Sequence, residues 1–232
     1  MSIDKTLYLF QYKDGYRYNS DSLILYDFIS KLNPKGTILD VGSGSGIVGL
    51  LIKRDFPNIE LFQIDIQSLH VKLTKKSAEY NKLKSIVLHT DIREAKFDRK
   101  FDFIVTNPPF YSKGSQKSEN ETLKISRYAD ILPFDELCKV VSKNLNPRGS
   151  FVFCYDAKQI DTLLSTLLTY KFKVNEIRFV HTKENRDASL ILIHARKSSK
   201  SLCKIEYPLY MDSKEMENIY KSTKTKSLLW VD

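Results

Sequence analysis

Strand-like and helix-like segments alternate along the chain from Thr37 onward, and this alternation constrains the fold more than any other feature. The predicted strands are 37–41, 60–65, 85–89, 101–106 and 150–155, and the predicted helices are 47–54, 68–81, 134–145 and 158–170. A strand–helix–strand succession favours a parallel sheet, because two parallel neighbours need a crossover long enough to hold a helix. We therefore predict a sheet built from five parallel strands.

The last two strand patterns, 175–181 and 189–195, differ from the others because only the polar loop 182–187 separates them. A loop of this length excludes a helical crossover, so these two strands are expected to be antiparallel. The resulting fold class is α/β. It is a Rossmann-like sheet of seven mostly parallel strands, with an antiparallel last strand and helices on both faces.

The length of 232 residues suits one large domain better than two. We expect a lead over residues 1–33 with a helix beginning near Ser20, a core over 34–197, and an extension over 198–232. The extension is polar and is predicted to be irregular, except for a helix at 214–222. The content of 42% hydrophobic and 28% charged residues is typical of a soluble globular protein.

Several classes of partner are disfavoured by the composition. No secretory segment starts the sequence, and no apolar run reaches membrane-spanning length. The three cysteines form no C-x-x-C pair and the four histidines lack metal-ligand spacing, so we expect neither disulfides nor a metal site. These features favour a cytoplasmic protein that binds no membrane and no metal, with a monomer as the favoured assembly.

The net charge is +9, and the basic residues are clustered along the chain. The clusters are Lys72/Lys75/Lys76, Lys82/Lys84, Lys113/Lys117/Lys124/Arg127 and Arg196/Lys197/Lys200/Lys204. A solvated lysine-rich surface would explain a mild excess of charge. Clustering favours a polyanionic partner such as RNA or DNA, because the neutralisation of phosphates supplies most non-specific affinity.

A glycine-rich turn, Asp40-Val41-Gly42-Ser43-Gly44-Ser45-Gly46, follows the first predicted strand and enters a helix. Its glycines (Gly42, Gly44 and Gly46) let the backbone turn tightly and approach a ligand closely. A dinucleotide site is one interpretation, since the carboxylate of Asp65 lies 25 positions after Asp40, at the end of the next strand. Two features oppose it: the negative charge of Asp40 is poorly placed for a pyrophosphate, and G-x-G-x-x-G phasing is absent.

Three aspartates at successive strand ends favour S-adenosylmethionine as the ligand. Asp40 would face the cationic sulfonium and ammonium side, Asp65 would accept the ribose hydroxyls, and Asp91 would accept the exocyclic amine of the adenine. Ile66 and Ile92 would form apolar walls for the adenine. Each aspartate alone could cap a helix, but three at successive strand ends are better explained by one ligand.

The strand at 101–106 is stopped by Asn107-Pro108-Pro109-Phe110, because two prolines fix two φ angles and remove two backbone donors. The Asn107 amide oxygen and the Pro108 carbonyl could accept both hydrogens of an aromatic amino group. Phe110 could stack on its ring, and such stacking contributes about 1–3 kcal/mol per base. Methyl transfer would then rest on proximity and orientation. We assign Asn107, Pro108, Pro109 and Phe110 to catalysis, and Asn107 to the cofactor site as well.

The segment 111–133 is more than twenty residues long, rich in Ser, Lys and Asn, and without clear periodicity. Loops of that length in compact domains tend to be functional or disordered. Since this one follows the proline turn directly, we predict a flap that contacts the substrate. Its candidate substrate-binding residues, with the preceding Phe110, are Tyr111, Lys113, Lys117 and Arg127.

With these motifs the chain resembles the class I methyltransferases of the Asn-Pro-Pro-(Phe/Tyr) group. More narrowly, it resembles the bacterial adenine-N6 methyltransferases that modify the anticodon loop of valine tRNA. The resemblance covers residues 10–208, and its further segments are 15–22, 178–181, 187–192 and 205–209. It implies an enzyme that uses S-adenosyl-L-methionine and acts on tRNA.

The resemblance also implies roles for the lead and for the flap. The lead around Tyr18, Ser20 and Asp21 is expected to fold over the methionine end of the cofactor. In the flap, the family usually has Ala-Arg-His-Glu where this chain has Ser126-Arg127-Tyr128-Ala129. Arg127 is therefore retained as a candidate RNA contact, whereas the histidine of the family is missing.

Other activities share parts of this pattern. Enzymes that methylate the N5 amide of glutamine in release factors use the same tetrapeptide, but they carry an N-terminal helical domain for which the residues before Asp40 leave no room. Guanine-N2 methyltransferases of ribosomal RNA are a closer alternative, although many have a duplicated domain. A non-catalytic RNA-binding module is disfavoured by the presence of Asp40, Asp65 and Asn107. Cytosine-C5 chemistry needs a cysteine nucleophile; none is expected near Pro108, and Cys154 is expected in the core.

Overall fold

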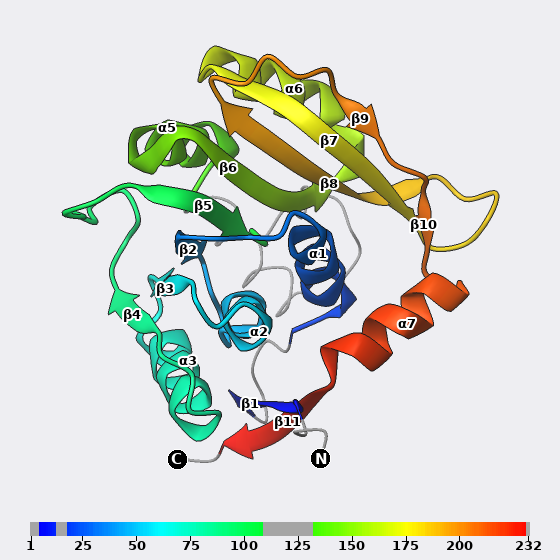
Figure 1. Ribbon diagram of the computed structural model, residues 1–232. Coiled ribbons are helices and arrows are strands. Elements are labelled where there is room, and N and C mark those ends of the chain that lie inside the picture. Colours follow the sequence, from blue (N-terminus) through cyan, green and yellow to red (C-terminus); the bar gives the residue numbers. More distant parts are fainter. Residues whose placement is uncertain (1–4, 13–17, 109–131, 231–232) are drawn as a thin grey trace, which may run out of the picture.

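A nine-stranded sheet forms the centre of the computed structural model, which describes residues 5–12, 18–108 and 132–230 (Figure 1). Its strands lie in the order β4 (Ile86–His89), β3 (Glu60–Asp65), β2 (Thr37–Val41), β5 (Phe101–Thr106), β6 (Leu145–Asp156), β8 (Ala188–Lys197), β7 (Phe172–His181) and β10 (Leu209–Tyr210). β9 (Lys204–Ile205) also pairs with β7. β2 therefore lies between β3 and β5, inside the sheet.

Strand directions match the predicted α/β class. β4, β3, β2, β5 and β6 run parallel to one another. β8, the last of the seven predicted strands in the sequence, lies between β6 and β7 and runs antiparallel to both. The prediction of a mostly parallel Rossmann-like sheet with an antiparallel last strand is confirmed.

Helices cover both faces of the sheet, because successive residues of a strand point to opposite sides. The helices are α1 (Ser20–Lys31), α2 (Ile47–Asp55), α3 (Ser68–Tyr80), α5 (Phe134–Asn144), the short η1 (Ala157–Gln159), α6 (Ile160–Thr169) and α7 (Lys214–Thr223). Ile38 and Val105 pack with α1, α2 and α7, whereas Leu39 and Ile104 pack with α5 and α6. Figure 1 shows α1 and α2 on one side and α5 and α6 on the other. In the described ranges, no helix has the length and apolar character needed to cross a membrane.

The two ends of the chain form a second, two-stranded parallel sheet of β1 (Leu7–Tyr12) and β11 (Thr225–Trp230) (Figure 1). β1 lies on α3 and the residue after it: the backbone amide of Tyr8 donates to Asn81 Oδ1 (2.9 Å) and that of Phe10 to Ser77 Oγ (3.0 Å). The prediction of an irregular extension is wrong for β9, β10 and β11, whereas its helix is confirmed as α7. Such short strands form because a partner is already in place, and local sequence does not reveal that partner.

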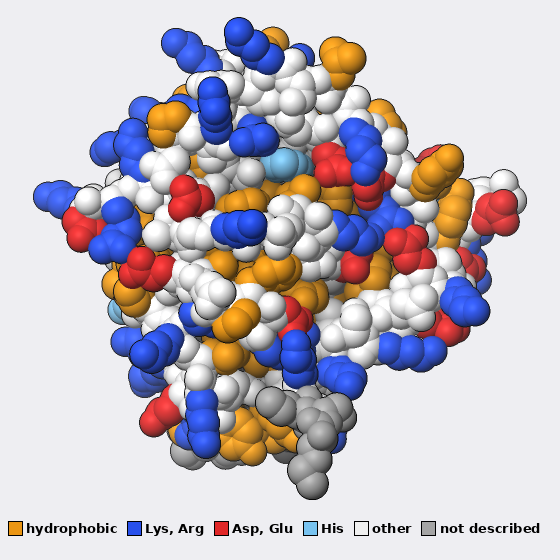
Figure 2. Space-filling view, viewed as in Figure 1, with side chains coloured by type: hydrophobic (Ala, Val, Ile, Leu, Met, Phe, Trp, Pro, Cys, Tyr) orange, Lys and Arg blue, Asp and Glu red, His pale blue; other side chains and the backbone are white. Residues whose placement is uncertain are grey.

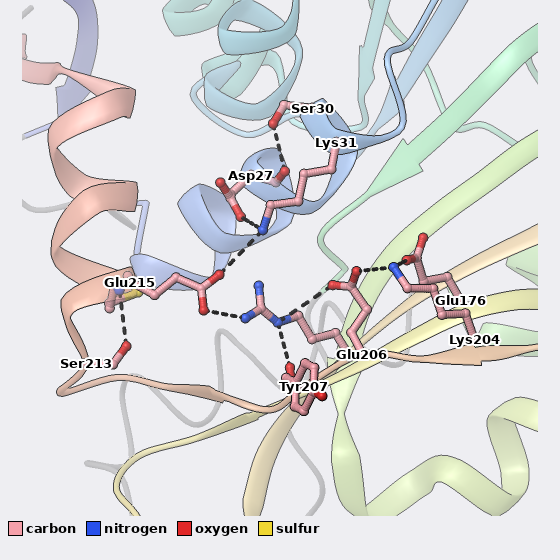
Figure 3. A network of polar contacts seen from close by, with 11 residues as sticks. Asp27, Ser30, Lys31, Glu176, Lys204, Glu206, Tyr207, Ser213 and Glu215 are labelled. Atoms are coloured by element: carbon pink, nitrogen blue, oxygen red, sulfur yellow. Dashed lines mark hydrogen bonds and ion pairs between the residues drawn. The ribbon is translucent and has the colours of Figure 1, made fainter.

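A buried arginine fastens the C-terminal extension to the core. Arg178 of β7 is 4% exposed; its Nη2 donates to Glu215 Oε2 in α7 (2.7 Å) and its Nε to the carbonyl oxygen of Tyr207 (3.1 Å). Glu206 Oε2 lies 3.9 Å from the same Nε. Lys31 Nζ of α1 lies 3.5 Å from Glu215 Oε1 (Figure 3). We call these five residues the anchor network, and they join β7, α7 and α1.

Candidate active site

The carboxyl ends of four parallel strands bring the predicted site residues to one edge of the sheet. Asp40 lies in β2, Asp65 ends β3, and Asn107 directly follows β5. Asp91 lies two residues beyond the end of β4. Since β3 and β5 pair with β2 on its two sides, Asp65 and Asn107 lie on either side of the glycine-rich turn that follows β2. This edge is where open α/β sheets bind their ligands.

The glycine-rich turn has a backbone that glycine adopts more easily than other residues. Gly42, Gly44 and Gly46 have φ values of 68°, 56° and 84°, in the left-handed region. A Cβ atom at Gly42 or Gly44 would meet nothing within 4 Å, whereas one at Gly46 would lie 2.8 Å from Thr74 Cγ2 in α3. Ser43 Oγ is buried and has no hydrogen-bond partner among the described residues. Open space beside two glycines and an unpaired hydroxyl fit a polar ligand at this turn.

Asp65 is buried and is held by three protein groups. Gly44 N (2.9 Å) and His70 Nδ1 (3.2 Å) contact its Oδ2, and Gln67 N donates to its Oδ1 (2.9 Å). A carboxylate has about four acceptor positions, so one remains for a ribose hydroxyl. The sequence-based prediction omits His70. Its position five residues after Asp65, at the start of α3, is the signal that could have included it.

Asp40 is a buried carboxylate that has no ion-pair partner in the part of the chain that is described. It is 2% exposed, and its Oδ2 accepts hydrogen bonds from Gly49 N (3.0 Å) and Gln63 Nε2 (3.1 Å). Burial raises the pKa of Asp40 to about 6; the two hydrogen bonds oppose this rise and the negative charge of Asp65 adds to it. A carboxylate with such a pKa at the ligand edge of a sheet is characteristic of functional sites.

Asp91 is paired with Arg93. The backbone amide of Arg93 donates to Asp91 Oδ1 (2.8 Å), and its Nε lies 3.0 Å from both carboxylate oxygens. These hydrogen bonds hold the pKa of Asp91 below its usual value, so the group is ionised at neutral pH. Arg93 Nη1 also donates to Glu136 Oε2 in α5 (2.9 Å). Of the two predicted apolar walls, Ile66 is 43% exposed and Ile92 only 6%, so Ile66 presents the larger apolar surface.

The amide of Asn107 is held from two directions. Its Nδ2 donates to Ser22 Oγ of α1 (3.0 Å), and Cys154 Sγ of β6 donates to its Oδ1 (3.0 Å). The contact with β6 follows from the sheet register, which pairs Thr106 with Phe153, the residues directly before Asn107 and Cys154. The contact with Ser22 follows from the packing of α1 on the sheet, and neither contact is part of the sequence-based prediction.

The expectation that no cysteine lies near Pro108 is wrong, because Cys154 contacts the preceding residue, Asn107. The expectation that Cys154 is buried is confirmed, since it is 0% exposed. Burial raises the pKa of its thiol well above the ordinary value, so Cys154 keeps its proton. Because the thiolate is the nucleophilic form of cysteine, this environment disfavours cytosine-C5 chemistry.

The remaining predicted cofactor residues, Tyr18, Ser20 and Asp21, lie where the chain enters α1. Tyr18 Oη donates to Thr225 Oγ1 of β11 (3.0 Å), and Asn19 Nδ2 donates to Asp21 Oδ2 (2.8 Å). Six other predicted site residues lie outside the described ranges: Pro109, Phe110, Tyr111, Lys113, Lys117 and Arg127. Within residues 5–12, 18–108 and 132–230, no group of three or more His, Cys, Asp and Glu side chains could hold a metal ion.

The chain is similar in sequence and in structure to several known methyltransferases. The family model described as methyltransferase small domain matches residues 18–159. A tRNA1(Val) (adenine(37)-N6)-methyltransferase of Pedobacter heparinus is 28% identical over 174 residues, which are 73% of this chain and 73% of the relative. The solved structure of a predicted O-methyltransferase of Agrobacterium tumefaciens is 15% identical, with a TM-score of 0.68 over 90% of this chain and 99% of that chain. The T. thermophilus 16S rRNA N2 G1207 methyltransferase, solved with AdoMet and guanosine, is 22% identical, with a TM-score of 0.55 over 80% of this chain and 45% of that chain.

The strand order in Figure 1 is that of the class I S-adenosylmethionine-dependent methyltransferases, and the ligand edge offers what such a cofactor requires. An open glycine turn, an unpaired hydroxyl and buried carboxylates all lie there. Because the family model spans more than half of the sequence, the chain belongs to the methyltransferase small domain family. It is a methyltransferase, and S-adenosyl-L-methionine is the methyl donor that this fold and these residues fit.

Proposed function

We propose that this enzyme transfers a methyl group from S-adenosyl-L-methionine to the exocyclic N6 amine of an adenine in the anticodon loop of valine tRNA. The observation that carries the proposal is the Asn107 amide, which stands at the carboxyl end of β5 beside the glycine-rich turn. The name of the Pedobacter heparinus relative, which specifies adenine 37 of tRNA1(Val), supports the choice of nucleotide. In this proposal the chain is a single domain that acts as a cytoplasmic monomer.

The proposed cofactor site uses the glycine-rich turn and the carboxylates at the strand ends. Bound S-adenosyl-L-methionine supplies a methyl group on a positively charged sulfur. Asp40 would act on that charge through its negative field; its Oδ2 already accepts two protein hydrogen bonds, so a direct contact with the cofactor would be made by Oδ1. Asp65 would accept a ribose hydroxyl. Asp91 would accept the adenine amine in place of one of its four contacts with the half-exposed Arg93. Ile66 and Ile92 would pack against the adenine ring.

The target amine is a weak nucleophile, because its lone pair is delocalised into the aromatic ring. Asn107 Oδ1 and the Pro108 carbonyl oxygen would accept its two hydrogens, which favours a pyramidal nitrogen with its lone pair directed at the methyl group. The methyl–sulfur bond breaks as the nitrogen–methyl bond forms, and S-adenosyl-L-homocysteine is the leaving group. The nitrogen is then positively charged and still carries two hydrogens; one leaves to solvent as a proton and the other stays, so no residue has to act as a strong base. The rate then depends mainly on how closely the side chains hold the two reactants in line.

Basic side chains are available for the phosphates of tRNA. Lys72, Lys75, Lys82 and Lys84 are exposed on α3 and on the segment that follows it. Figure 2 shows Lys and Arg side chains distributed over the visible face rather than gathered in one patch. Contacts spread over many phosphates give an affinity that falls steeply with salt. Extrusion of a base costs a few kcal/mol and least where the base is unpaired, which favours a loop nucleotide.

Transfer of a labelled methyl group to total tRNA that lacks this modification tests the proposal. We expect the label to appear as N6-methyladenine in valine tRNA. Label in N2-methylguanine of ribosomal RNA would identify the guanine alternative instead, and label in protein would identify the glutamine alternative. Binding of the cofactor without transfer to any of these substrates would identify a non-catalytic RNA-binding module.

A further inference from the structure

Both polar atoms of the Asn107 amide are already bonded within the protein. Nδ2 donates to Ser22 Oγ at 3.0 Å, and Oδ1 accepts from Cys154 Sγ at 3.0 Å. A carbonyl oxygen has two lone pairs, so Oδ1 can accept one further hydrogen from a substrate amine. We call Ser22, Asn107 and Cys154 the amide clamp.

The amide clamp is assembled from three elements that pack on one another. Ser22 is the third residue of α1, Cys154 lies on β6, and Asn107 follows β5, which pairs with β6. Cys154 faces the side of the sheet that α1 covers, since both contribute to the same hydrophobic cluster. Ser22 is 4% exposed and Cys154 0%, so both partners of the partly buried Asn107 amide are shielded from water.

The clamp restricts a rotation that is otherwise easy. The torsion that turns an asparagine amide is broad and roughly twofold, so an unrestrained amide can present either its oxygen or its NH₂ group. Ser22 Oγ can accept from Nδ2 or donate to Oδ1, whereas Cys154 Sγ donates to Oδ1 and is only a weak acceptor for Nδ2, so the thiol favours the observed orientation of the amide. Burial raises the pKa of the Cys154 thiol well above its ordinary value, so the thiol proton is retained and is available to Oδ1.

We propose that Ser22 and Cys154 are positioning residues for methyl transfer: together they direct Asn107 Oδ1 toward the substrate amine whose hydrogen it accepts. The inference rests on the proposed function of Asn107. Transfer by proximity is sensitive to small displacements of the reacting groups. Loss of either contact therefore slows the transfer step and leaves the binding of the methyl donor unchanged.

Two equally buried cysteines allow a matched test. Cys154→Ala removes the thiol beside Asn107, whereas Cys138→Ala removes a thiol in α5, which packs on the other face of the sheet; both residues are 0% exposed. We expect kcat to fall about tenfold for Cys154→Ala, with an unchanged Kd for S-adenosyl-L-methionine. Cys138→Ala should keep the wild-type kcat. Cys154→Ser restores a hydrogen-bond donor and should recover most of the loss.

Double variants that include Asn107→Ala distinguish a positioning role of Ser22 and Cys154 from a purely structural one. In an Asn107→Ala background, Cys154→Ala and Ser22→Ala should cause no further loss of kcat, because the amide that they hold is gone. Equal losses for Cys154→Ala and Cys138→Ala would overturn the inference. An undiminished effect of Cys154→Ala in the Asn107→Ala background would overturn it as well.

Failure of the proposed function would look different from failure of the clamp. A wild-type enzyme that labels an amine other than adenine N6 would refute the proposed substrate. The same variants, measured on the amine that is labelled, would then test whether Ser22 and Cys154 position Asn107.

Discussion

The two ends of α1 make polar contacts of opposite kinds. At its first turn, Ser22 belongs to the amide clamp, whose contacts are hydrogen bonds between neutral groups. At its last turn, Lys31 Nζ lies 2.7 Å from Asp27 Oδ2 and 3.5 Å from Glu215 Oε1. Glu215 in turn lies 2.7 Å from the buried Arg178 of the anchor network (Figure 3). One helix thus links the hydrogen-bonded amide clamp to the ion-paired attachment of the C-terminal extension.

The difference follows from what each end does. Methyl transfer to an amine places positive charge on the nitrogen, so oxygen acceptors and nearby negative charge favour the reaction and a nearby cation would oppose it. The anchor network has no such constraint, and its ion pairs compensate the charge of Arg178. Asp40 at the catalytic edge is also buried, but unlike Arg178 it has no ion-pair partner among the described residues. Its field suits a site that receives a cationic methyl donor.

Disruption of the anchor network, at the last turn of α1, is expected to have the largest effect on stability. Arg178→Ala removes a cation that is 4% exposed and leaves Glu206 and Glu215 without it. Glu206 keeps its contact with Lys204 and Glu215 its contact with Lys31, so the loss is mainly that of charged hydrogen bonds. The free energy of unfolding, measured in urea, should fall by about 1.5–3 kcal/mol, while the folded enzyme keeps the wild-type kcat. A loss below about 1 kcal/mol would show that the anchor network contributes no more than a surface ion pair.

Disruption of the amide clamp, at the first turn of α1, should lower activity and leave stability nearly unchanged. Asn107→Ala removes the acceptor for the amine, so kcat should fall about 10²–10³-fold, as for the loss of one group that stabilises a transition state. The midpoint of thermal unfolding should change little. Because Asn107 is also assigned to the cofactor site, the Kd for S-adenosyl-L-methionine can rise, but by much less than kcat falls. Asn144→Ala is the matched control, because its amide bonds the carbonyl of Val140 in α5 (3.0 Å), on the other face of the sheet. Full activity of Asn107→Ala would remove the role assigned to this amide.

Asp40 should make stability depend on pH with the opposite sign to a salt-bridged carboxylate. Its pKa of about 6 in the folded protein lies above the value of about 4 in an unfolded chain. Between these pH values the folded state holds a proton that the unfolded state has lost. The contribution to stability is therefore complete below about pH 4 and is lost as pH rises through about 6, by on the order of 3 kcal/mol.

Urea unfolding of the cofactor-free protein between pH 4 and 7 measures this effect. Asp40→Asn should remove this fall in stability with rising pH, because the substituted side chain has no proton to lose. Burial lowers the pKa of His194 to about 4 and makes stability rise over the same pH range, so the difference between wild type and Asp40→Asn, and not either curve alone, measures Asp40. The same pH slope in the wild type and in Asp40→Asn would show that another group is responsible.

The smallest effect is expected for Lys31, the exposed cation of the anchor network. Lys31 is 45% exposed, so Lys31→Ala should lower the free energy of unfolding by less than about 1 kcal/mol. Urea unfolding alongside Arg178→Ala compares an exposed ammonium group with a buried guanidinium group that share the partner Glu215. A loss as large as that of Arg178→Ala would instead mean that the anchor network is stabilising only as a complete unit.

The central sheet could be predicted because its information is local. The strands are apolar runs, and the glycine and proline turns mark where two of them end. The pairing of β1 with β11 could not be predicted, because the partners lie at opposite ends of the chain. Trp230 shows the same dependence on tertiary structure: Lys76 Nζ lies 3.1 Å from the centroid of its ring, and no spacing in the sequence indicates this contact.

In the candidate active site, too, some residues could be placed from local sequence and others only from tertiary structure. Asp65, Asp91 and Asn107 could be placed at one edge because parallel strands end there together. Ser22 and Cys154 could not be linked to Asn107 from the sequence. Their contacts join α1 and β6 to the end of β5, and they depend on the pairing of β5 with β6 and on where α1 packs. Cys154 carried one usable signal, its position near the end of a predicted strand, but the neighbour of that strand is known only from the sheet.

The distance between Asn107 Oδ1 and the amine nitrogen of a bound adenine tests the central claim most directly. A crystal structure of the enzyme with S-adenosyl-L-homocysteine and an RNA stem-loop that contains the target adenine would give this distance. We expect about 2.7–3.2 Å, with Ser22 and Cys154 still in contact with the amide. An amine bonded elsewhere, or an Asn107 amide turned so that Nδ2 faces the amine, would contradict the account.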